Sequence, residues 1–162
     1  MHERVFIGID PGFSGAFACY RPEQSALIIE DMPLMTDPKS GRTLLNYRGV
    51  FTLLQPNPDL PVTMAMLEQV AARPGQGAPA TFRFGQGYGA LEMALAGHLI
   101  PTTYITPAKW KKHFGLSKDK GASRTLASQL FPQYADLFTL VKHDGRAEAA
   151  LLALYAHQTH VQ

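Results

Sequence analysis

The sequence is short of cysteine, of long apolar runs and of net charge, and each shortage excludes a class of protein. Cys19 is the single cysteine, which excludes an internal disulfide and a cysteine-rich zinc site and fits a reducing cytoplasm. No stretch approaches the roughly 20 apolar residues of a membrane-spanning helix, so we expect no membrane partner. No P-loop is present, so we expect no nucleotide cofactor. A net charge of +2 does not by itself establish a nucleic-acid partner.

Length and composition predict one soluble domain covering residues 1–162. The chain is 46% hydrophobic and 17% charged, which is ordinary for a globular protein that buries a core. The first strand follows almost directly on Met1 and leaves no room for a signal peptide, so a cytoplasmic location is expected. We find no internal repeat and no low-complexity linker.

The N-terminal half begins with a buried strand that ends in an acid. Residues 5–9 form a short apolar run that leads into Asp10, and Pro11-Gly12 then turn the chain. Residues 15–20 and 26–30 predict two further strands in an antiparallel meander. Residues 33–41 are rich in turn-forming residues and predict a loop, whereas the spacing of leucines predicts a helix over 44–55.

The second half alternates strands and helices. Residues 62–68 repeat the pattern of a buried strand ending in an acid, here Glu68. A glycine-rich loop over 73–79 follows, and then a helix over 81–98, a short strand over 103–105 and helices from Pro107, over 122–130 and over 144–157. Gly85, Gly87 and Gly89 would each cost that helix about 1 kcal/mol relative to alanine unless another backbone packs closely there. The pattern predicts a partly antiparallel α/β sheet.

Four carboxylates form the candidate site. Asp10 and Glu68 end strands that should be central, so adjacent strand tips would place them together, although an Asp-Pro-Gly turn alone would also explain Asp10. Asp144 and Glu148 lie one turn apart on one face of the last helix, where helix capping is the alternative role. Clustered acids repel one another unless cations neutralise them, and Mg²⁺ or Mn²⁺ favours such all-oxygen ligands.

Positive charge gathers between residues 109 and 124. The stretch contains Lys109, Lys111, Lys112, Lys118, Lys120 and Arg124. Trp110 and Phe114 should anchor it as buried rings while the lysines project toward a phosphate backbone, or else the lysines form a solvated helix face. Arg73 and Gln76, in the loop after Glu68, should reach DNA near the site.

Several segments resemble the RuvC family of Holliday junction resolvases. The resemblance lies in Ile7-Gly8-Ile9-Asp10-Pro11-Gly12, in Leu67-Glu68-Gln69-Val70, in residues 83–89 and in the acidic Ala/Leu-rich last helix. Residues 74–77 and 143–149 are more similar to phage-encoded RuvC-like endonucleases, which implies a bacterial or phage-infected cytoplasm. The resemblance implies a ribonuclease H-like mixed sheet, with the first three strands antiparallel and the later ones parallel, flanked by helices.

The resemblance also implies an activity. RuvC-like proteins are homodimers that cut four-way DNA junctions by paired nicks leaving 5′ phosphates, and a dimer suits two symmetric cuts. It implies two Mg²⁺ ions, replaceable by Mn²⁺, held by Asp10, Glu68, Asp144 and Glu148, with His143 as a further ligand or proton carrier. Lys118 or Lys120 matches a DNA-contacting lysine. The helix around 82–97 would pack against its mate through Phe82, Phe84, Gly85 and Gly89.

Two departures from the RuvC pattern leave alternatives open. RuvC spaces its last two ligands three residues apart, whereas Asp144 and His143 precede Glu148 by four and five residues; we favour Asp144. Ala71-Ala72 replace the aromatic wedge of RuvC, so a wedge is absent or moved to Phe82 or Phe84. The alternative functions are a branched or flap DNA nuclease of the same fold and a non-catalytic junction binder. A kinase or ATPase of the actin type normally needs more than 162 residues.

Overall fold

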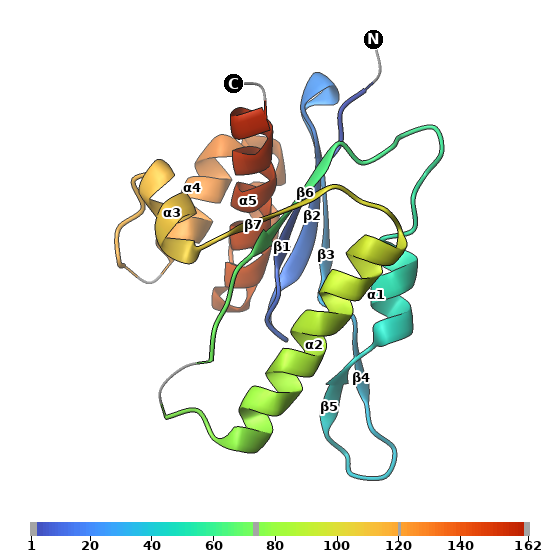
Figure 1. Ribbon diagram of the computed structural model, residues 1–162. Helices are drawn as coiled ribbons and strands as arrows, with labels where there is room; N and C mark the ends of the chain where they lie inside the picture. The colour runs from blue at the N-terminus through green and yellow to red at the C-terminus, as the bar shows by residue number, and fades with distance from the viewer. Residues whose placement is uncertain (1–2, 73–74, 120, 161–162) are drawn as a thin grey trace.

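The computed structural model describes residues 3–72, 75–119 and 121–160, which surround one mixed β-sheet (Figure 1). The strand order is β3-β2-β1-β6-β7, with bounds β1 (Phe6–Asp10), β2 (Ala16–Arg21), β3 (Ala26–Asp31), β6 (Met64–Glu68) and β7 (Thr102–Ile105). The first three strands are antiparallel, and β6 and β7 run parallel to β1. This is the ribonuclease H-like arrangement that the resemblance implies.

Helices cover both faces of this sheet. They are α1 (Tyr47–Leu53), α2 (Ala78–Gly97), α3 (Pro107–His113), α4 (Ala122–Leu130) and α5 (Asp144–His160), with 3-10 turns at Pro22–Gln24, Pro132–Phe138 and Val141–His143. Helices α1 and α2 lie on one face, and α3, α4 and α5 lie on the other (Figure 1). Among the described helices, none has the length and apolarity that crossing a bilayer requires.

Alternation along β1 and β6 divides the core into two layers. Phe6 and Met66 pack in the cluster with α5, whereas Ile7, Ile9 and Leu67 pack in the cluster with α2. This period of two is the reason why both strands are apolar throughout, since each face meets a helix. The same alternation turns the side chains at the strand ends toward α5.

Helix α5 packs on β1 at very short range. A Cβ atom built on Gly8 would lie 2.0 Å from the carbonyl oxygen of Ala149 and 2.4 Å from the backbone nitrogen of Ala153. Glycine in the strand and alanines in the helix therefore let the two backbones approach each other. The close contact fixes the position of α5 relative to the end of β1.

One predicted region is wrong. The predicted loop over 33–41 contains strand β4 (Leu34–Thr36), and the first residues of the predicted helix over 44–55 form its partner β5 (Thr43–Leu45). In the turn between them, Asp37 N–H donates to the carbonyl oxygen of Arg42 and Gly41 N–H donates to that of Asp37. Asn46 caps α1 by accepting from Gly49 N–H. Leu44 and Leu45 mimic helical spacing, but they belong to a strand because the helix begins only after this cap.

The other predicted elements are confirmed, with shifted ends. Helix α2 starts at Ala78 and α5 extends to His160. Inside α2, a Cβ on Gly85 or Gly89 would meet no atom of the described residues within 4 Å, and one on Gly87 would meet only side chains. The described residues therefore provide no close backbone packing against these glycines.

Candidate active site

Two acids of the site come from the ends of adjacent parallel strands. Ile9 of β1 pairs with Leu67 of β6, so Asp10 and Glu68 lie one residue beyond this pair in neighbouring strands. By the alternation described above, both side chains emerge on the α5 face. The sheet register thus brings together residues that are 58 positions apart in the sequence.

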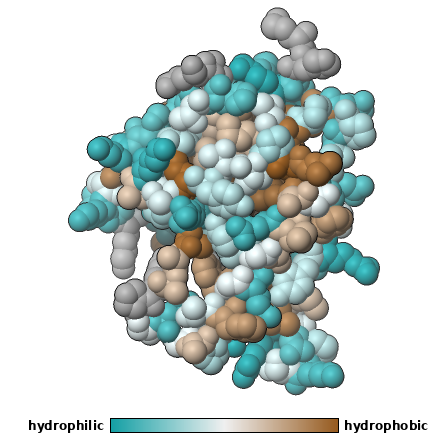
Figure 2. Space-filling view, viewed as in Figure 1, coloured by the Kyte–Doolittle hydropathy of each residue, from teal (hydrophilic) through white to brown (hydrophobic). Residues whose placement is uncertain are grey.

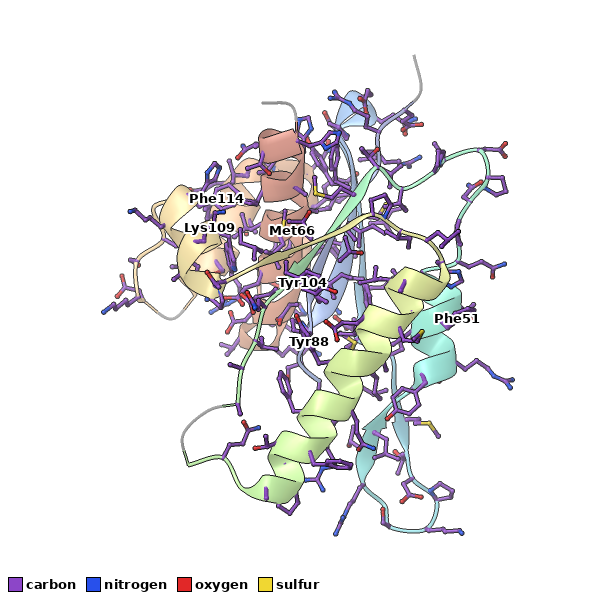
Figure 3. All side chains as sticks on the ribbon, viewed as in Figure 1. Phe51, Met66, Tyr88, Tyr104, Lys109 and Phe114 are labelled. Carbon is purple, nitrogen blue, oxygen red and sulfur yellow. The ribbon has the colours of Figure 1, made fainter. Side chains whose placement is uncertain are left out.

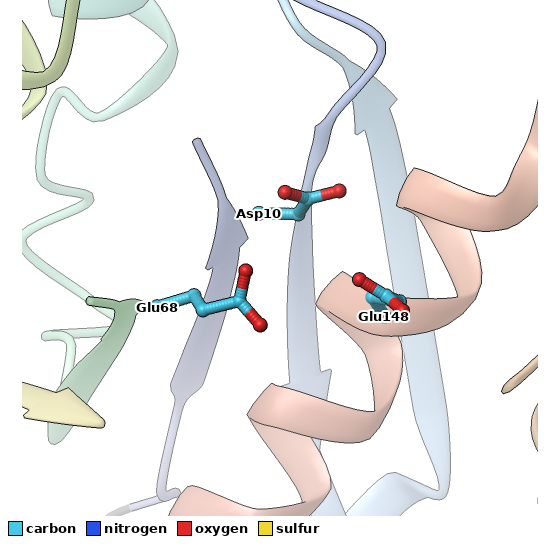
Figure 4. Close-up of side chains that lie close together, drawn as sticks. All are labelled: Asp10, Glu68 and Glu148. Atoms are coloured by element: carbon cyan, nitrogen blue, oxygen red, sulfur yellow. The ribbon is translucent and has the colours of Figure 1, made fainter. Parts of the chain in front are cut away.

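Glu148 of α5 completes a group of three carboxylates (Figure 4). One oxygen each from Asp10, Glu68 and Glu148 lies within 4.8 Å of the others. The first turn of α5 comes close because Gly145 has no side chain: a Cβ there would lie 2.2 Å from the carbonyl oxygen of Ser14 and 3.1 Å from Asp10 Oδ2. The three oxygens are close enough together to bind one cation in common.

The electrostatics of Asp10 show a shortage of positive charge. The pKa of Asp10 is raised from 3.8 to about 7, mainly by burial and also by the negative charges of Glu148 and Glu68. A hydrogen bond from the Gly12 backbone and the charge of Lys111 oppose this rise. Three carboxylates and no softer donor make an oxygen-only ligand set, which suits Mg²⁺ or Mn²⁺. The residues present therefore fit a divalent metal site.

Residues from three helices support these acids. Lys111 Nζ pairs with Glu148 Oε1 at 2.8 Å, and Ser123 Oγ lies 3.3 Å from the same oxygen. Trp110 Nε1–H donates to Glu68 Oε1 at 2.8 Å. Tyr88 reaches from α2 toward the sheet (Figure 3), where its hydroxyl donates to the backbone oxygen of Glu68 at 3.3 Å. Glu68 and Glu148 are thus each bonded to a residue of α3.

Asp144 lies near this group but is not a member of it. Arg124 Nε donates to Asp144 Oδ1 at 2.6 Å, and the Asp144 side chain is 52% exposed. Asp144 lines the same cleft as Asp10 and Glu148. Its predicted role as a metal ligand stays a prediction, because that role requires the side chain to exchange Arg124 for a metal.

His143 is buried in the turn that leads into α5. Its Nδ1 accepts from Leu140 N–H at 3.2 Å. Burial lowers the pKa of His143, and the positive charges of Arg146 and Lys142 lower it further. Among the described residues that line the cleft, His143 does not appear. Its predicted role as a ligand or proton carrier stays a prediction.

The acids open into a cleft of about 1090 Å³. Its lining includes Lys111, Lys112, Lys118 and Lys142 together with Asp10, Asp144 and Glu148. Lysines therefore surround the acids where a phosphate backbone would enter. Lys109 lies on α3 at the surface (Figure 3), and Arg124 is mostly buried against Asp144. Arg73 and Lys120 lie outside the described residues.

A smaller hollow of about 500 Å³ borders the site on the side of Glu68. Gln76 and Phe84 line it together with Glu68 itself. Phe82 is instead 67% exposed on α2, next to the open Gly85 and Gly89. Exposed apolar residues form separate brown areas in the space-filling view (Figure 2). The four predicted interface residues therefore divide between the hollow and the outer surface of α2.

Sequence reasoning missed the contacts of three supporting residues and the place of one lysine in the cleft. The bonds of Trp110, Tyr88 and Ser123 to the acids join residues 20 to 42 positions apart, and no local pattern encodes them. Lys142 had a signal, since it stands directly before His143-Asp144 at the start of the acidic helix. The buried ring of Trp110 was predicted, but its hydrogen bond was not.

Comparison with known proteins supports the fold. No protein-family model and no curated protein matches the sequence. Among solved structures, RuvC of Thermus thermophilus in complex with a Holliday junction substrate aligns with a TM-score of 0.61 and 18% identity, covering 96% of each chain. Another Thermus thermophilus RuvC structure aligns with a TM-score of 0.57 and 17% identity, again covering 96% of each. The chain therefore shares the ribonuclease H-like fold of RuvC.

Proposed function

We propose that this protein is a metal-dependent endonuclease that resolves four-way DNA junctions. The observation that carries the proposal is the convergence of Asp10, Glu68 and Glu148 within 4.8 Å, beside a cleft that lysines line. The likeness to a RuvC that binds a Holliday junction supports branched DNA as the substrate. The reaction is hydrolysis of a phosphodiester bond, with a nick on each of two symmetric strands and a 5′ phosphate at each nick.

Asp10, Glu68 and Glu148 would hold Mg²⁺ or Mn²⁺, and Asp144 would join them for a second ion after releasing Arg124. Bound divalent ions lower the pKa of water and offset charge on the reacting phosphate. Asp10 needs a nearby cation to stay charged, because burial and two neighbouring carboxylates disfavour its charge. Lys111, Lys112, Lys118 and Lys142 would bind the flanking phosphates.

The proposal includes a homodimer formed through the outer face of α2. Phe82 and Met93 are 67% and 68% exposed on this helix, and Gly85 and Gly89 lie between them with open space above their Cα atoms. A second copy would bury these two side chains and let two helix backbones approach. We expect wild type to sediment as a dimer and Met93→Glu as a monomer, whereas Leu130→Glu, on the exposed side of α4, remains dimeric.

The decisive experiment is cleavage of a labelled synthetic four-way junction with Mg²⁺, with Mn²⁺ or with EDTA. Wild type is compared with Asp10→Asn, and linear duplex and flap DNA serve as controls. We expect paired nicks that need a divalent ion, are lost in Asp10→Asn, and are faster on the junction than on the other DNAs.

Three results would change the proposal. Faster cutting of flaps than of junctions would assign a broader branched-DNA nuclease. Tight junction binding without cutting, under any divalent ion, would assign a non-catalytic binder. Indifference to every DNA would contradict a DNA-directed function altogether.

A further inference from the structure

Helix α3 carries two adjacent residues that reach two acids of the site, Glu68 and Glu148. Trp110 donates its indole N–H to Glu68 Oε1 at 2.8 Å, and Lys111 pairs with Glu148 Oε1 at 2.8 Å. The ammonium group of Lys111 also lies 5.1 Å from the centroid of the Trp110 ring. The two contacts differ in kind, because Trp110 is 0% exposed whereas the Lys111 side chain is 39% exposed.

We infer that Trp110 is a positioning residue that sets the orientation of Glu68 for metal binding. This inference rests on the proposed metal-dependent function. The ring is held in the core cluster that also contains Met66 and Ile105, so its N–H has a fixed direction. Glu68 is itself only 6% exposed, and a carboxylate that accepts from a rigid donor loses rotational freedom before any ion arrives.

A carboxylate can accept the indole hydrogen and still bind a cation. Its two oxygens offer about four lone-pair sites, and the indole N–H uses one of them. Tyr88 restrains the same residue by donating to the backbone oxygen of Glu68, so both the main chain and the side chain of Glu68 are bonded. Such supporting bonds around metal ligands are typically worth about 10- to 100-fold in metal affinity.

Lys111 takes the opposite role. Its ammonium group offsets the charge of Glu148 from a partly exposed position, so a divalent ion can replace it without disturbing the core. Trp110 cannot be replaced in this way, because its ring is fully buried. Helix α3 therefore holds one acid permanently and the other exchangeably.

The test measures metal binding directly, by calorimetric titration of the DNA-free protein with Mn²⁺. The variant Trp110→Phe keeps an aromatic ring and removes the donor, and we expect its dissociation constant for Mn²⁺ to rise by about 10- to 100-fold. Nicking by this variant should recover at saturating Mn²⁺, because the bond acts on metal affinity. Phe114→Leu is the matched control: it shortens a partly buried ring just after α3 that packs on His113 and Tyr155, and its Mn²⁺ affinity should equal that of wild type.

A second variant covers the case in which Trp110→Phe does not fold. The chain has one tryptophan, so benzothienylalanine can replace it, with a sulfur atom where the indole has its N–H. This shape-matched replacement should weaken Mn²⁺ binding to the same extent with an unchanged unfolding midpoint. Unchanged Mn²⁺ affinity in either folded variant would overturn only the inference about Trp110. Absence of Mn²⁺ binding in wild type would overturn the proposed metal site and the inference with it, whereas metal binding without DNA cutting would contradict only the nuclease.

Discussion

The two long helices, α5 and α2, lie on opposite faces of the same sheet and differ in how much of their surface the chain itself covers. Ten of the 17 residues of α5 are buried, compared with four of the 20 residues of α2. Helix α5 meets β1 backbone to backbone at Gly8 and supplies a carboxylate to the site. Helix α2 turns Phe82, Met93 and two glycines outward.

This difference separates two uses of small residues. On α5 and β1 they serve contacts inside the chain, since a Cβ on Gly8 would overlap the helix backbone. On α2 the glycines at 85 and 89 serve no contact among the described residues, although each weakens the helix. The α5 face therefore builds the site, and the α2 face is available for a second copy under the proposed dimer.

The largest expected effect is that of Gly8→Ala. The added methyl group would lie 2.0 Å from the carbonyl oxygen of Ala149, which is backbone and cannot rotate away. Overpacking of this kind should lower the free energy of unfolding by about 3 kcal/mol or more. Denaturant unfolding followed by circular dichroism measures the loss. Near-wild-type stability would mean that α5 can move off β1. The contrast between a closely packed α5 and an uncovered α2 would then disappear.

A second comparison lies within α5, between Glu148 and Asp144. We expect Glu148→Gln to weaken Mn²⁺ binding by more than about 100-fold, because Glu148 belongs to the group of three acids and supporting residues alone are worth about 10- to 100-fold. Asp144→Asn should weaken it by less than about tenfold, since Asp144 is half-exposed and paired with Arg124. Calorimetric titration of both variants measures the ratio. Equal losses would place Asp144 among the principal ligands.

The same pair shows how far the sequence can define the site. Apolar runs ending in Asp10 and Glu68 predict two strand tips, and parallel pairing of those tips brings the acids together. The i,i+4 spacing predicts that Asp144 and Glu148 share a helix face. It does not predict that Arg124, which stands 20 residues earlier, binds Asp144. The bond between Trp110 and Glu68 is equally nonlocal, because it spans 42 positions.

The fold was predictable where burial on both faces gives a strand an uninterrupted apolar pattern. It was not predictable at β5, where Leu44, Leu45 and Val50 fit a helical period. The hairpin forms there because Asn46 N–H bonds to the carbonyl of Pro33 and the Asn46 side chain caps the next helix. Such competition between a local period and a long-range pairing is decided by tertiary contacts.

A third prediction concerns the negative charge of Asp10, which lowers the stability of the folded protein. The pKa of Asp10 is about 7 in the folded protein and 3.8 ordinarily, so between these values the folded state binds more protons than the unfolded state. Stability of the metal-free protein should therefore fall as pH rises from about 4 to about 7. Asp10→Asn removes this penalty and should raise the free energy of unfolding by about 1 to 3 kcal/mol above pH 7.

Unfolding midpoints of wild type and Asp10→Asn at pH 5 and pH 8, in EDTA, test this prediction. The gain in stability of Asp10→Asn over wild type should be larger at pH 8. Replacing EDTA with Mg²⁺ should make this gain smaller, because the ion stabilises wild type. A gain for Asp10→Asn that is equal at both pH values would contradict the assignment of the penalty to the charge of Asp10.

The smallest expected effect is that of Gly89→Ala, and its sign depends on self-association. A methyl group at position 89 would meet no described atom within 4 Å, so in the monomer it should stabilise α2 by about 0.5 to 1 kcal/mol. In a dimer whose helices approach each other at Gly89, the same methyl group would weaken association. Unfolding midpoints measured across a range of protein concentrations should therefore show a gain at low concentration and a loss at high concentration. A gain that is the same at every concentration would place the dimer contact elsewhere, because only a partner's backbone can turn this substitution from favourable to unfavourable.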